Sequence, residues 1–537
     1  MFRSRLGTVL ICISFIVLLL AACSPNSSTS VDTNEDPNEK SQGGEKVLSV
    51  AIYGEPDSLD PAWAATYPDL AITMSIFNGL VRFPPGTVDV NNIEPDLAES
   101  WETNDDSTVW TFYLREGVQW HKGYGELTSE DVKWSFERIM DEETGSSWRN
   151  DFNNVISIET PDDYTVVFNL ERADSAFLLK VVNFHGGLIT NKQAIEDAGD
   201  NFKHSPVGTG PFVLESYKPQ EGATLVKNEE YFRGVPKLDK IRVQVFRDQT
   251  AIDVAQDRGE IHLAAGVSDK LWVENREKSD KVVIDYRQPP TFYSMYMNTS
   301  KPPLDNILVR QAIAHAIDVE TMVQSQLGDK LGAVPKGPII SGYFGSADVG
   351  IHEFDPEKSK QLLAEAGYEN GLQLDPQFVS NTSNYMDKAV FVQEQLRAVG
   401  IEMPIEAVDN ATMHSNIRDD MNQLIFYPYT RVPHVDVPLT EFFYGPSIVT
   451  KPTGALNFAH YDKVDDLIEK ARYAPDTKTA MNLYREIQEK IKDDYVVVPL
   501  ADTVSPLIRT SNVDLGPNGF KGSLTYFYQI DENYDIK

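Results

Sequence analysis

The sequence predicts a mixed α/β protein with two lobes. Short runs rich in β-branched and aromatic residues alternate with amphipathic helical patterns along the chain. The 537 residues exceed what one hydrophobic core usually organises. No fixed-period repeat of the kind that builds solenoids or propellers is present in the sequence. Strands interleaved with helices in a chain of this length favour two or three domains.

The N-terminus has the three parts of a secretory signal. Arg3 and Arg5 precede a nearly unbroken apolar run, and small residues then lead to Cys23. The apolar run is shorter than the roughly 20 residues that a membrane-spanning helix needs. We therefore interpret residues 1–22 as a signal peptide. Residues 23–46 are polar and poor in large apolar side chains, which predicts a disordered tether.

The segment 20–23, Leu-Ala-Ala-Cys, is similar to the lipobox of bacterial lipoproteins. In that motif the cysteine thiol receives a diacylglycerol, and cleavage leaves the cysteine first in the mature chain. Cys12 would depart with the signal, so the mature chain would contain no disulfide. The resemblance implies that Cys23 anchors the protein to the extracytoplasmic face of the cell membrane. The alternative is an ordinary signal peptide in which Cys23 has no role.

The chain is strongly acidic, with a formal net charge of -33. Such a surface repels nucleic acid, so we expect no nucleic-acid partner. The mean hydropathy of -0.33 argues against membrane spans beyond the N-terminal run. We interpret the acidity as a solubility feature of an exported protein; it does not identify a ligand.

Local patterns place the first elements. Strands are expected at residues 46–54, 108–120 and 162–170, the second with a turn at Glu116-Gly117. A helix is expected at 128–140, where Thr128 or Ser129 can cap the N-terminus. Further along, apolar spacing and end signals predict a strand at 238–246, a helix and strand in 248–264, helices at 309–327, 355–368, 385–401 and 462–474, and a helix followed by a strand in 479–501.

Four stretches, in this order, resemble the family 5 solute-binding proteins of ABC importers, which include oligopeptide- and dipeptide-binding proteins. They are residues 55–62 (EPDSLDPA), 95–139, 206–212 (PVGTGPF) and 297–318. PVGTGPF has the residues of a tight, close-packed turn and lacks the Lys-Ser/Thr of a phosphate loop. The aromatic residues of the second stretch are expected to form a core; they are Trp110, Tyr113, Trp120 and Phe136.

The resemblance implies a hinged, two-lobed fold of the type II periplasmic-binding-protein class with an extra subdomain. Two crossing segments, near residues 286–290 and 500–506, would join the lobes. The implied parts are lobe 1 (46–73, 206–285 and 502–537), the extra subdomain (74–205) and lobe 2 (286–501).

The resemblance also implies a function without covalent chemistry. A lipid-anchored, monomeric receptor would capture a small solute between its lobes and deliver it to an ABC permease and ATPase complex. Because peptides are frequent solutes in this family, a short peptide is the favoured solute. No cofactor or metal is expected. The alternatives are an oligosaccharide or other non-peptide solute, including a metal chelate, a secreted hydrolase, or a surface receptor with the same fold. Hydrolase motifs such as His-Glu-x-x-His and Gly-x-Ser-x-Gly are missing from the sequence.

One departure from the family concerns the ligand site. Peptide-binding members have a Trp-x-x-Asp-Tyr-like stretch whose aspartate pairs with the peptide α-ammonium. This chain has Tyr427, Tyr429, Thr430 and Arg431 in that region, and Asp436 is a possible replacement for the aspartate. A buried ammonium without a carboxylate would be costly, so α-amino recognition is in doubt.

Seven residues are candidate ligand contacts. Tyr427, Tyr429 and Arg431 alternate, so a strand would present all three on one face, able to stack on a sugar or hold a carboxylate. Alternatively, the tyrosines pack within the lobe and Arg431 is solvated. The other candidates are Asp436, Glu55, which faces the cleft in the family fold or is otherwise a turn residue, and Tyr293 and Tyr296, which follow the first crossing.

Overall fold

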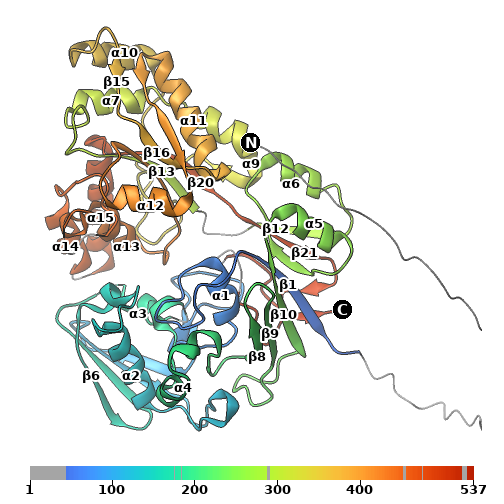
Figure 1. Cartoon of the computed structure of the whole chain (residues 1–537). Helices are drawn as coiled ribbons and strands as arrows, with labels where there is room; N and C mark the ends of the chain where they lie inside the picture. Colours follow the sequence, from blue (N-terminus) through green and yellow to red (C-terminus); the bar gives the residue numbers. More distant parts are fainter. Residues whose placement is uncertain are drawn as a thin grey trace, which may run out of the picture. The chain divides into compact units, whose positions relative to one another are not determined.

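The computed structural model describes residues 44–174, 176–182, 184–286, 291–451, 455–474, 476–522 and 529–537. The predicted signal peptide, Cys23 and nearly all of the predicted tether lie outside the described residues, as does most of the crossing expected at 286–290. Three larger sheets and their helices make up the fold (Figure 1). Within the described ranges, no helix has the length and apolar character needed to cross a membrane.

A seven-stranded sheet brings together strands from the start, middle and end of the chain. Its order is β12-β21-β11-β1-β10-β9-β8, and β1 lies parallel to both of its neighbours. The central residues of β1 are buried, as expected for an interior strand. Its strands are β1 (Val47–Tyr53), β8 (Phe212–Lys218), β9 (Gly222–Lys227), β10 (Lys240–Phe246), β11 (Leu263–Ala265), β12 (Val282–Tyr286) and β21 (Pro506–Thr510). Helices α5 (Gln249–Asp257) and α6 (Lys270–Arg276) lie beside β12 and β21 (Figure 1).

The second sheet, called the β5 sheet here, is antiparallel with the order β4-β5-β7-β6. Its strands are β4 (Ala98–Thr103), β5 (Val109–Leu114), β6 (Val155–Asp162) and β7 (Thr165–Leu170). Helix α2 (Ser129–Met140) packs on it and is capped by Thr128, as predicted. The α2 residue Phe136 is fully buried and meets Phe168 edge to face, with ring centres 5.0 Å apart.

One aromatic residue of this region departs from the expected core. Trp120 and Phe136 are buried and Trp110 is half-buried, but Tyr113 is 37% exposed and donates a hydrogen bond to Glu102. Tyr113 alternates with the buried neighbours Phe112 and Leu114 in β5, so the strand period directs it outward.

The third sheet, called the β13 sheet here, has the order β14-β20-β13-β19 and is also antiparallel. Its strands are β13 (Thr291–Met297), β14 (Gly332–Ala333), β19 (Leu424–Tyr429) and β20 (Val497–Thr503). Every residue of β13 and β20 is buried, because helices cover both faces. Tyr293, Met295 and Met297 face one hydrophobic cluster and Phe292 and Tyr296 face another, which follows the strand period of two.

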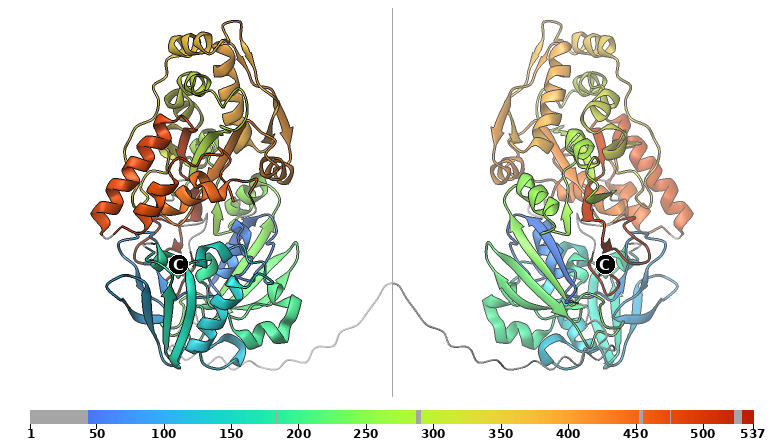
Figure 2. Two further views of the ribbon diagram at one scale, coloured as in Figure 1. Left: turned by 90° about the vertical axis from the view of Figure 1, so that its left-hand side faces the viewer. Right: turned by 90° about the vertical axis from the view of Figure 1, so that its right-hand side faces the viewer.

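One face of the β13 sheet packs against α8 (Val319–Gln326) and α11 (Ser383–Ala398). The other face packs against α13 (Asp436–Phe443), α14 (Asp465–Arg472) and α15 (Thr477–Asp493), which stay together in all views (Figures 1 and 2). The remaining elements of this half are α7 (Ile307–His315), α9 (Gly328–Leu331), α10 (Pro356–Glu365), α12 (Asn410–Arg418) and the paired short strands β15 (Leu372–Gln373) with β17 (Ile401–Glu402) and β16 (Gln377–Ser380) with β18 (Ile405–Val408).

The prediction of one continuous helix at 309–327 is wrong. The structure contains two helices, α7 and α8, with a break between His315 and Val319. The side chain of Asp318 accepts a hydrogen bond from the backbone N–H of Thr321 and so starts α8. An aspartate that caps a new helix competes with continuation of the old one. By contrast, α11 ends near Gly400 as predicted, and Gly400 has a φ of +92°.

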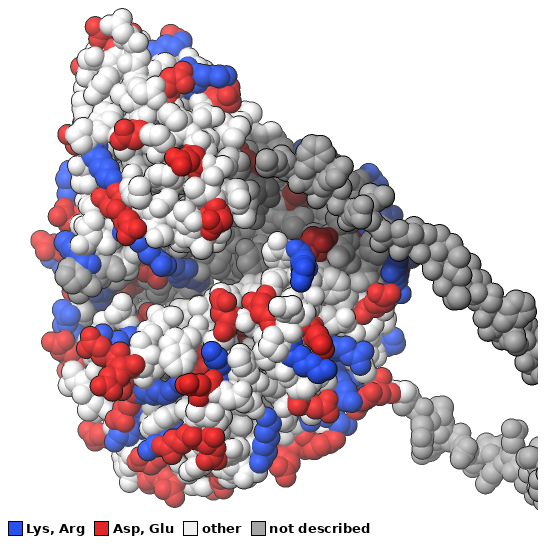
Figure 3. Space-filling view, in the orientation of Figure 1, with Lys and Arg blue, Asp and Glu red and all other residues white. Residues whose placement is uncertain are grey.

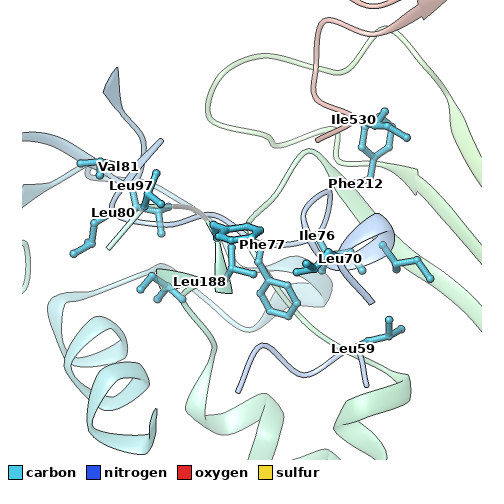
Figure 4. Packing of buried hydrophobic residues seen from close by; sticks show 14 of the residues in the cluster. Leu59, Leu70, Ile76, Phe77, Leu80, Val81, Leu97, Leu188, Phe212 and Ile530 are labelled. Atoms are coloured by element: carbon cyan, nitrogen blue, oxygen red, sulfur yellow. The ribbon is translucent and has the colours of Figure 1, made fainter. Parts of the chain in front are cut away.

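The PVGTGPF segment forms the predicted close-packed turn. A Cβ atom on Gly208 would lie 2.1 Å from the carbonyl oxygen of Ile76, and one on Gly210 would lie 2.6 Å from the carbonyl carbon of the same residue. Ile76 and Phe77 belong to the core drawn in Figure 4, beside Phe212. The glycines therefore let two backbones touch at the edge of this core.

The chain passes from the β13 sheet to the seven-stranded sheet at Val504 and Ser505, between β20 and β21. Acidic and basic side chains are interspersed over the face shown in Figure 3. The other short elements are α1 (Tyr67–Thr73), α3 (Phe177–Lys180), α4 (Lys192–Ala198), β2 (Val81–Arg82) paired with β3 (Glu94–Pro95), and β22 (Val513–Asp514) paired with β23 (Asp535–Ile536).

Candidate ligand-binding site

Charged side chains from two distant parts of the chain come together in what we call the charge cluster. One side comes from segments next to the β5 sheet, and the other comes from the segment after β19 together with α13 and α14. The members are Asp151, Asp174 and Lys180 on the first side and Arg431, Asp436, Glu441 and Arg472 on the second. The charges of the two sides act on one another: Arg472 lowers the pKa of Asp174, and Asp436 raises the pKa of Lys180.

On the first side, Lys180 at the end of α3 donates a hydrogen bond of 2.7 Å to Asp174. Only 3% of the Asp174 side chain is exposed, so the carboxylate depends on this partner. Burial acts to raise the pKa of Asp174, but the charge and the hydrogen bond of Lys180 outweigh it and hold that pKa below its ordinary value. The pair is therefore ionised on both sides at neutral pH.

On the second side, each arginine also has a carboxylate. Arg431 Nε donates to Glu441 Oε2 at 2.7 Å, and Arg472 Nε contacts both oxygens of Asp436 at 3.1 and 3.2 Å. The backbone of Arg431 is fixed by Tyr343, whose hydroxyl accepts from the Arg431 N–H and donates to its carbonyl, both at 2.6 Å. These contacts fix the arginines of the second side of the cluster before any ligand binds.

Asp151 is the exception in the cluster. It lies in a short 3-10 helix (Arg149–Phe152), and its side chain is exposed and has no hydrogen bond or ion pair within the described ranges. Burial by the surrounding protein raises its pKa to about 6, Lys180 and Arg431 act in the opposite direction, and Glu441 acts to raise it. The charges that act on Asp151 come from both sides of the cluster: Lys180 and Asp174 from the first, and Arg431 and Glu441 from the second.

Aromatic rings lie beside these charges. His185 stacks on Trp148 with ring centres 3.7 Å apart and an interplanar angle of 9°, and it also lies 3.5 Å from the ring centre of Phe184. Burial, with Arg431 adding to it, lowers the pKa of His185 well below its ordinary value, so the imidazole is neutral. Burial likewise lowers the pKa of His434. Flat apolar faces next to fixed charges can hold a solute that is apolar in part and charged in part.

Three of the predicted ligand residues belong to this region. Arg431 and Asp436 are cluster members, and Tyr427 lies within the electrostatic range of Arg431 and Glu441. Asp436 pairs with Arg472, so the carboxylate suggested as a replacement for the family aspartate is already occupied. Thr430, in the segment where the family aspartate is missing, shares a 2.9 Å hydrogen bond with Thr291.

The other predicted residues lie elsewhere. Tyr296 and Tyr429 are buried against Phe442, with ring centres 5.3 and 4.8 Å from it. Tyr293 is 8% exposed and lies 4.2 Å from the Lys388 ammonium on the opposite face of β13. Both oxygens of Glu55 bind within the seven-stranded sheet region, to the Tyr217 hydroxyl and the Gln220 N–H. Strand β19 ends at Tyr429, so Arg431 does not share the expected strand face with the two tyrosines.

The structure also reveals residues that the sequence did not single out. Asp151, Lys180, Glu441 and Arg472 belong to no recognisable site motif in the sequence, and only the fold brings them together. A cavity of about 430 Å³ lies next to the segment that follows β19, on the second side of the cluster. Its lining consists of Thr87, Val88, Asp89, Ser341, Gly342, Pro433 and Lys521. In the part of the chain that is described, no group of three or more His, Cys, Asp or Glu side chains is arranged to hold a metal ion.

Comparisons with known proteins agree with this architecture. The family described as bacterial extracellular solute-binding proteins, family 5 Middle, matches residues 92–450. The chain resembles the structure of the binding protein MoaA from A. tumefaciens R10 in complex with mannopinic acid, with a TM-score of 0.84 and 34% identity over 92% of this chain and 100% of the other. The periplasmic binding protein DppA of Helicobacter pylori, in complex with the peptide STSA, gives a TM-score of 0.78 and 29% identity over 91% and 98%.

Among curated proteins, heme-binding protein A of Haemophilus influenzae is 26% identical over 528 residues, which cover 91% of this chain and 92% of the relative. All three are named as binding proteins, and the two solved structures share the predicted periplasmic-binding-protein fold with this chain. The match covers more than half of the chain, and this protein therefore belongs to the bacterial extracellular solute-binding proteins of family 5.

Proposed function

We propose that this protein is the lipid-anchored receptor of an ABC importer and that it captures a short peptide at the charge cluster. The observation that supports this most is the cluster itself, in which fixed ion pairs from two separate parts of the chain come together. Such a site can order charged ends of a small solute without altering it. Membership of the solute-binding family supports the same role.

A second candidate solute is a non-peptide compound of the kind that MoaA binds. The structure of MoaA in complex with mannopinic acid matches this chain at 34% identity, against 29% for the peptide complex of DppA. The lack of the family's ammonium-binding aspartate in the segment 427–431 favours this candidate as well.

Thermal-shift screening followed by calorimetry distinguishes the peptide from the non-peptide solute. The purified mature protein would be tested with the peptide STSA, a library of tripeptides with free N-termini, and mannopinic acid. A rise in Tm and saturable binding with peptides supports the first proposal, and a rise with mannopinic acid alone supports the second. No stabilisation by any of the three would overturn both.

The working cycle that we propose is a population shift. The parts bounded as lobe 1 (46–73, 206–285 and 502–537), the extra subdomain (74–205) and lobe 2 (286–501) would move as bodies about the crossings, and solute would favour the compact state because it contacts both sides. The strand membership of the seven-stranded sheet supports these boundaries. X-ray scattering should give a smaller radius of gyration with a stabilising solute; an unchanged radius contradicts closure.

Anchoring through Cys23 is part of the proposal and rests on the lipobox-like segment alone. Labelling cells with a radioactive fatty acid should mark the wild-type protein and leave Cys23→Ala unlabelled. Equal labelling of the two would refute the anchor.

A further inference from the structure

The cavity of about 430 Å³ next to the charge cluster is lined by segments that lie far apart in the sequence. Residues 87–89 lie between β2 and β3, and Lys521 belongs to the C-terminal segment. Residues 341–342 and 433 come from the part of the chain that contains the β13 sheet. A solute in this cavity would therefore contact several separate parts of the chain at once.

The two segments that carry Asp89 and Lys521 are bonded to each other. The backbone N–H of Lys521 donates to the carbonyl oxygen of Gly86 at 2.9 Å. Gly86 has a φ of +83°, and a Cβ atom on it would lie 2.3 Å from the carbonyl oxygen of Gly519. Only glycine allows this close approach, which fixes the backbone beneath both charged side chains.

The remaining lining is also held in place, and it leaves space for a solute. The backbone N–H of Phe344 donates to the carbonyl oxygen of Pro433 at 2.9 Å. A Cβ atom on Gly342 would meet nothing within 4 Å. Pro433 lies two residues after Arg431, so the cavity adjoins the charge cluster.

The charged side chains of this lining are Lys521 and Asp89, and both are exposed. Within the described ranges, neither forms an ion pair, with the other or with a third residue. Asp89 Oδ1 accepts hydrogen bonds from the backbone and side-chain nitrogens of Asn91, at 3.0 and 3.3 Å, and these donors are uncharged. By contrast, every cation of the charge cluster already has a carboxylate partner.

A second cavity, of about 310 Å³, provides a comparison. Its lining also contains charged side chains, but they are paired: Arg509 with Asp285 at 2.7 Å and Lys537 with Asp514 at 3.1 Å. Of these two cavities, the one next to the charge cluster is the one that offers a cation and an anion without charged partners.

We propose that the cavity next to the charge cluster binds a zwitterionic solute, with its carboxylate at Lys521 and its ammonium at Asp89. Two opposite charges that lack partners complement a molecule that carries both. The cavity volume lies in the range of small-molecule sites. This inference rests on the proposed solute-binding function and names the charges that the solute presents. A short peptide with free ends has this pattern, and Asp89 supplies the carboxylate that the segment 427–431 lacks.

The test uses two variants that each remove one charge, with a matched control for each. Lys521→Gln and Asp89→Asn would be compared with wild type, and the controls Lys537→Gln and Asp514→Asn remove paired charges from the second cavity. Asp89→Asn keeps an oxygen that can accept from Asn91, and Lys521→Gln keeps the backbone contact, so both variants should fold. Calorimetry would use the tripeptide library with free ends, the same library N-acetylated, and the same library C-amidated.

Each variant should lose affinity only for peptides that carry the matching charge. Lys521→Gln should weaken free peptides about tenfold, the lower end for a hydrogen bond to a charged group, and bind C-amidated peptides as wild type does. Asp89→Asn should weaken free peptides to a similar extent and bind N-acetylated peptides as wild type does. Both controls should match wild type with every probe. If a variant weakens free and blocked peptides equally, its side chain does not bind the solute charge, and the proposal is wrong.

The outcomes also separate this inference from the proposed function. Peptides that bind wild type and both variants with equal affinity would overturn the inference alone. If mannopinic acid binds and peptides do not, Lys521→Gln should weaken the acid about tenfold, and unchanged affinity would overturn the inference. If none of the probes binds wild type, the proposed function fails and this inference fails with it.

A spectroscopic measurement locates the bound solute. Reductive methylation with ¹³C-formaldehyde gives each lysine an NMR signal, and Lys521→Gln and Lys537→Gln assign two of them. A solute that binds should shift the Lys521 signal and leave the Lys537 signal in place. A solute that saturates the protein without moving the Lys521 signal binds elsewhere and contradicts the proposal.

Discussion

Arg172 and Glu469 form an ion pair, 3.3 Å from Nη1 to Oε2, between the segment that follows β7 and helix α14. The Arg172 guanidinium also lies 4.5 Å from the ring centre of Tyr473. These contacts join the two sides of the charge cluster directly. The Arg172 side chain is 54% exposed, so the pair contributes little to folding stability, but it is made only while the two sides are together.

Replacing Arg172 should therefore affect binding more than folding. Arg172→Ala should weaken the binding of a stabilising solute about 2- to 5-fold, the magnitude of an exposed ion pair, and leave Tm nearly unchanged. Calorimetry and thermal unfolding measure the two effects. The control is Lys192→Ala, which removes a 3.8 Å ion pair with Glu196 inside α4. Equal affinities for the two variants would show that the contact has no part in closure.

The carboxyl of Asp151 should titrate at a higher pH than an ordinary aspartate. Burial raises the pKa of this carboxyl to about 6, so the group is ionised at pH 7.5 and becomes neutral as the pH falls below 6. Carbon NMR of protein labelled at the aspartate carboxyls, with Asp151→Asn for assignment, reports this titration directly. A midpoint near 4, the ordinary value, would show a well-solvated carboxylate and contradict the expectation.

Removing only one member of the buried ion pair between Arg472 and Asp436 should lower the stability of the folded protein. Their side chains are 14% and 7% exposed, and Arg472→Met would leave the Asp436 carboxylate without its cation. We expect a loss of about 3–5 kcal/mol in the free energy of unfolding, because an uncompensated buried charge remains. Urea unfolding measures it. The double variant Arg472→Met with Asp436→Asn should recover part of the loss; if it is no more stable than the single variant, the cost comes from packing.

The turn at Gly210 should tolerate no side chain. A Cβ atom there would lie 2.6 Å from the carbonyl carbon of Ile76, so the two backbones must separate in Gly210→Ala. The expected cost is about 1–3 kcal/mol or more, as for overpacking of a core. Thermal unfolding measures it against Gly44→Ala, where a Cβ atom would meet nothing within 4 Å. Wild-type stability of Gly210→Ala would show that the turn can relax.

Local signals explain which parts of the fold could be predicted. Helix α2 has a cap at Thr128 and an apolar face, both readable within a dozen residues, and the structure confirms them. The break between α7 and α8 was missed because apolar spacing continues through Asp318, and the side-chain cap decides the outcome. Tyr113 was placed inward on its aromatic character, although the strand period directs it outward.

The candidate site shows a different limit. Arg431 and Tyr427 were found because they occupy a segment that carries the ligand site in the resembling family. Asp151 lies far from them in the sequence, and no spacing rule connects it to that segment. The charges that act on it, Arg431 and Glu441 among them, are brought near only by the fold.

The position of β21 has a consequence for how the seven-stranded sheet is assembled. Strand β21 follows both β11 and β12 in the chain, yet in the sheet it is inserted between them. Without β21, strand β12 has no partner in this sheet and β11 pairs only with β1. The seven-stranded sheet is therefore completed only by pairing between segments far apart in the sequence, which is the slowest kind of contact for a folding chain to make.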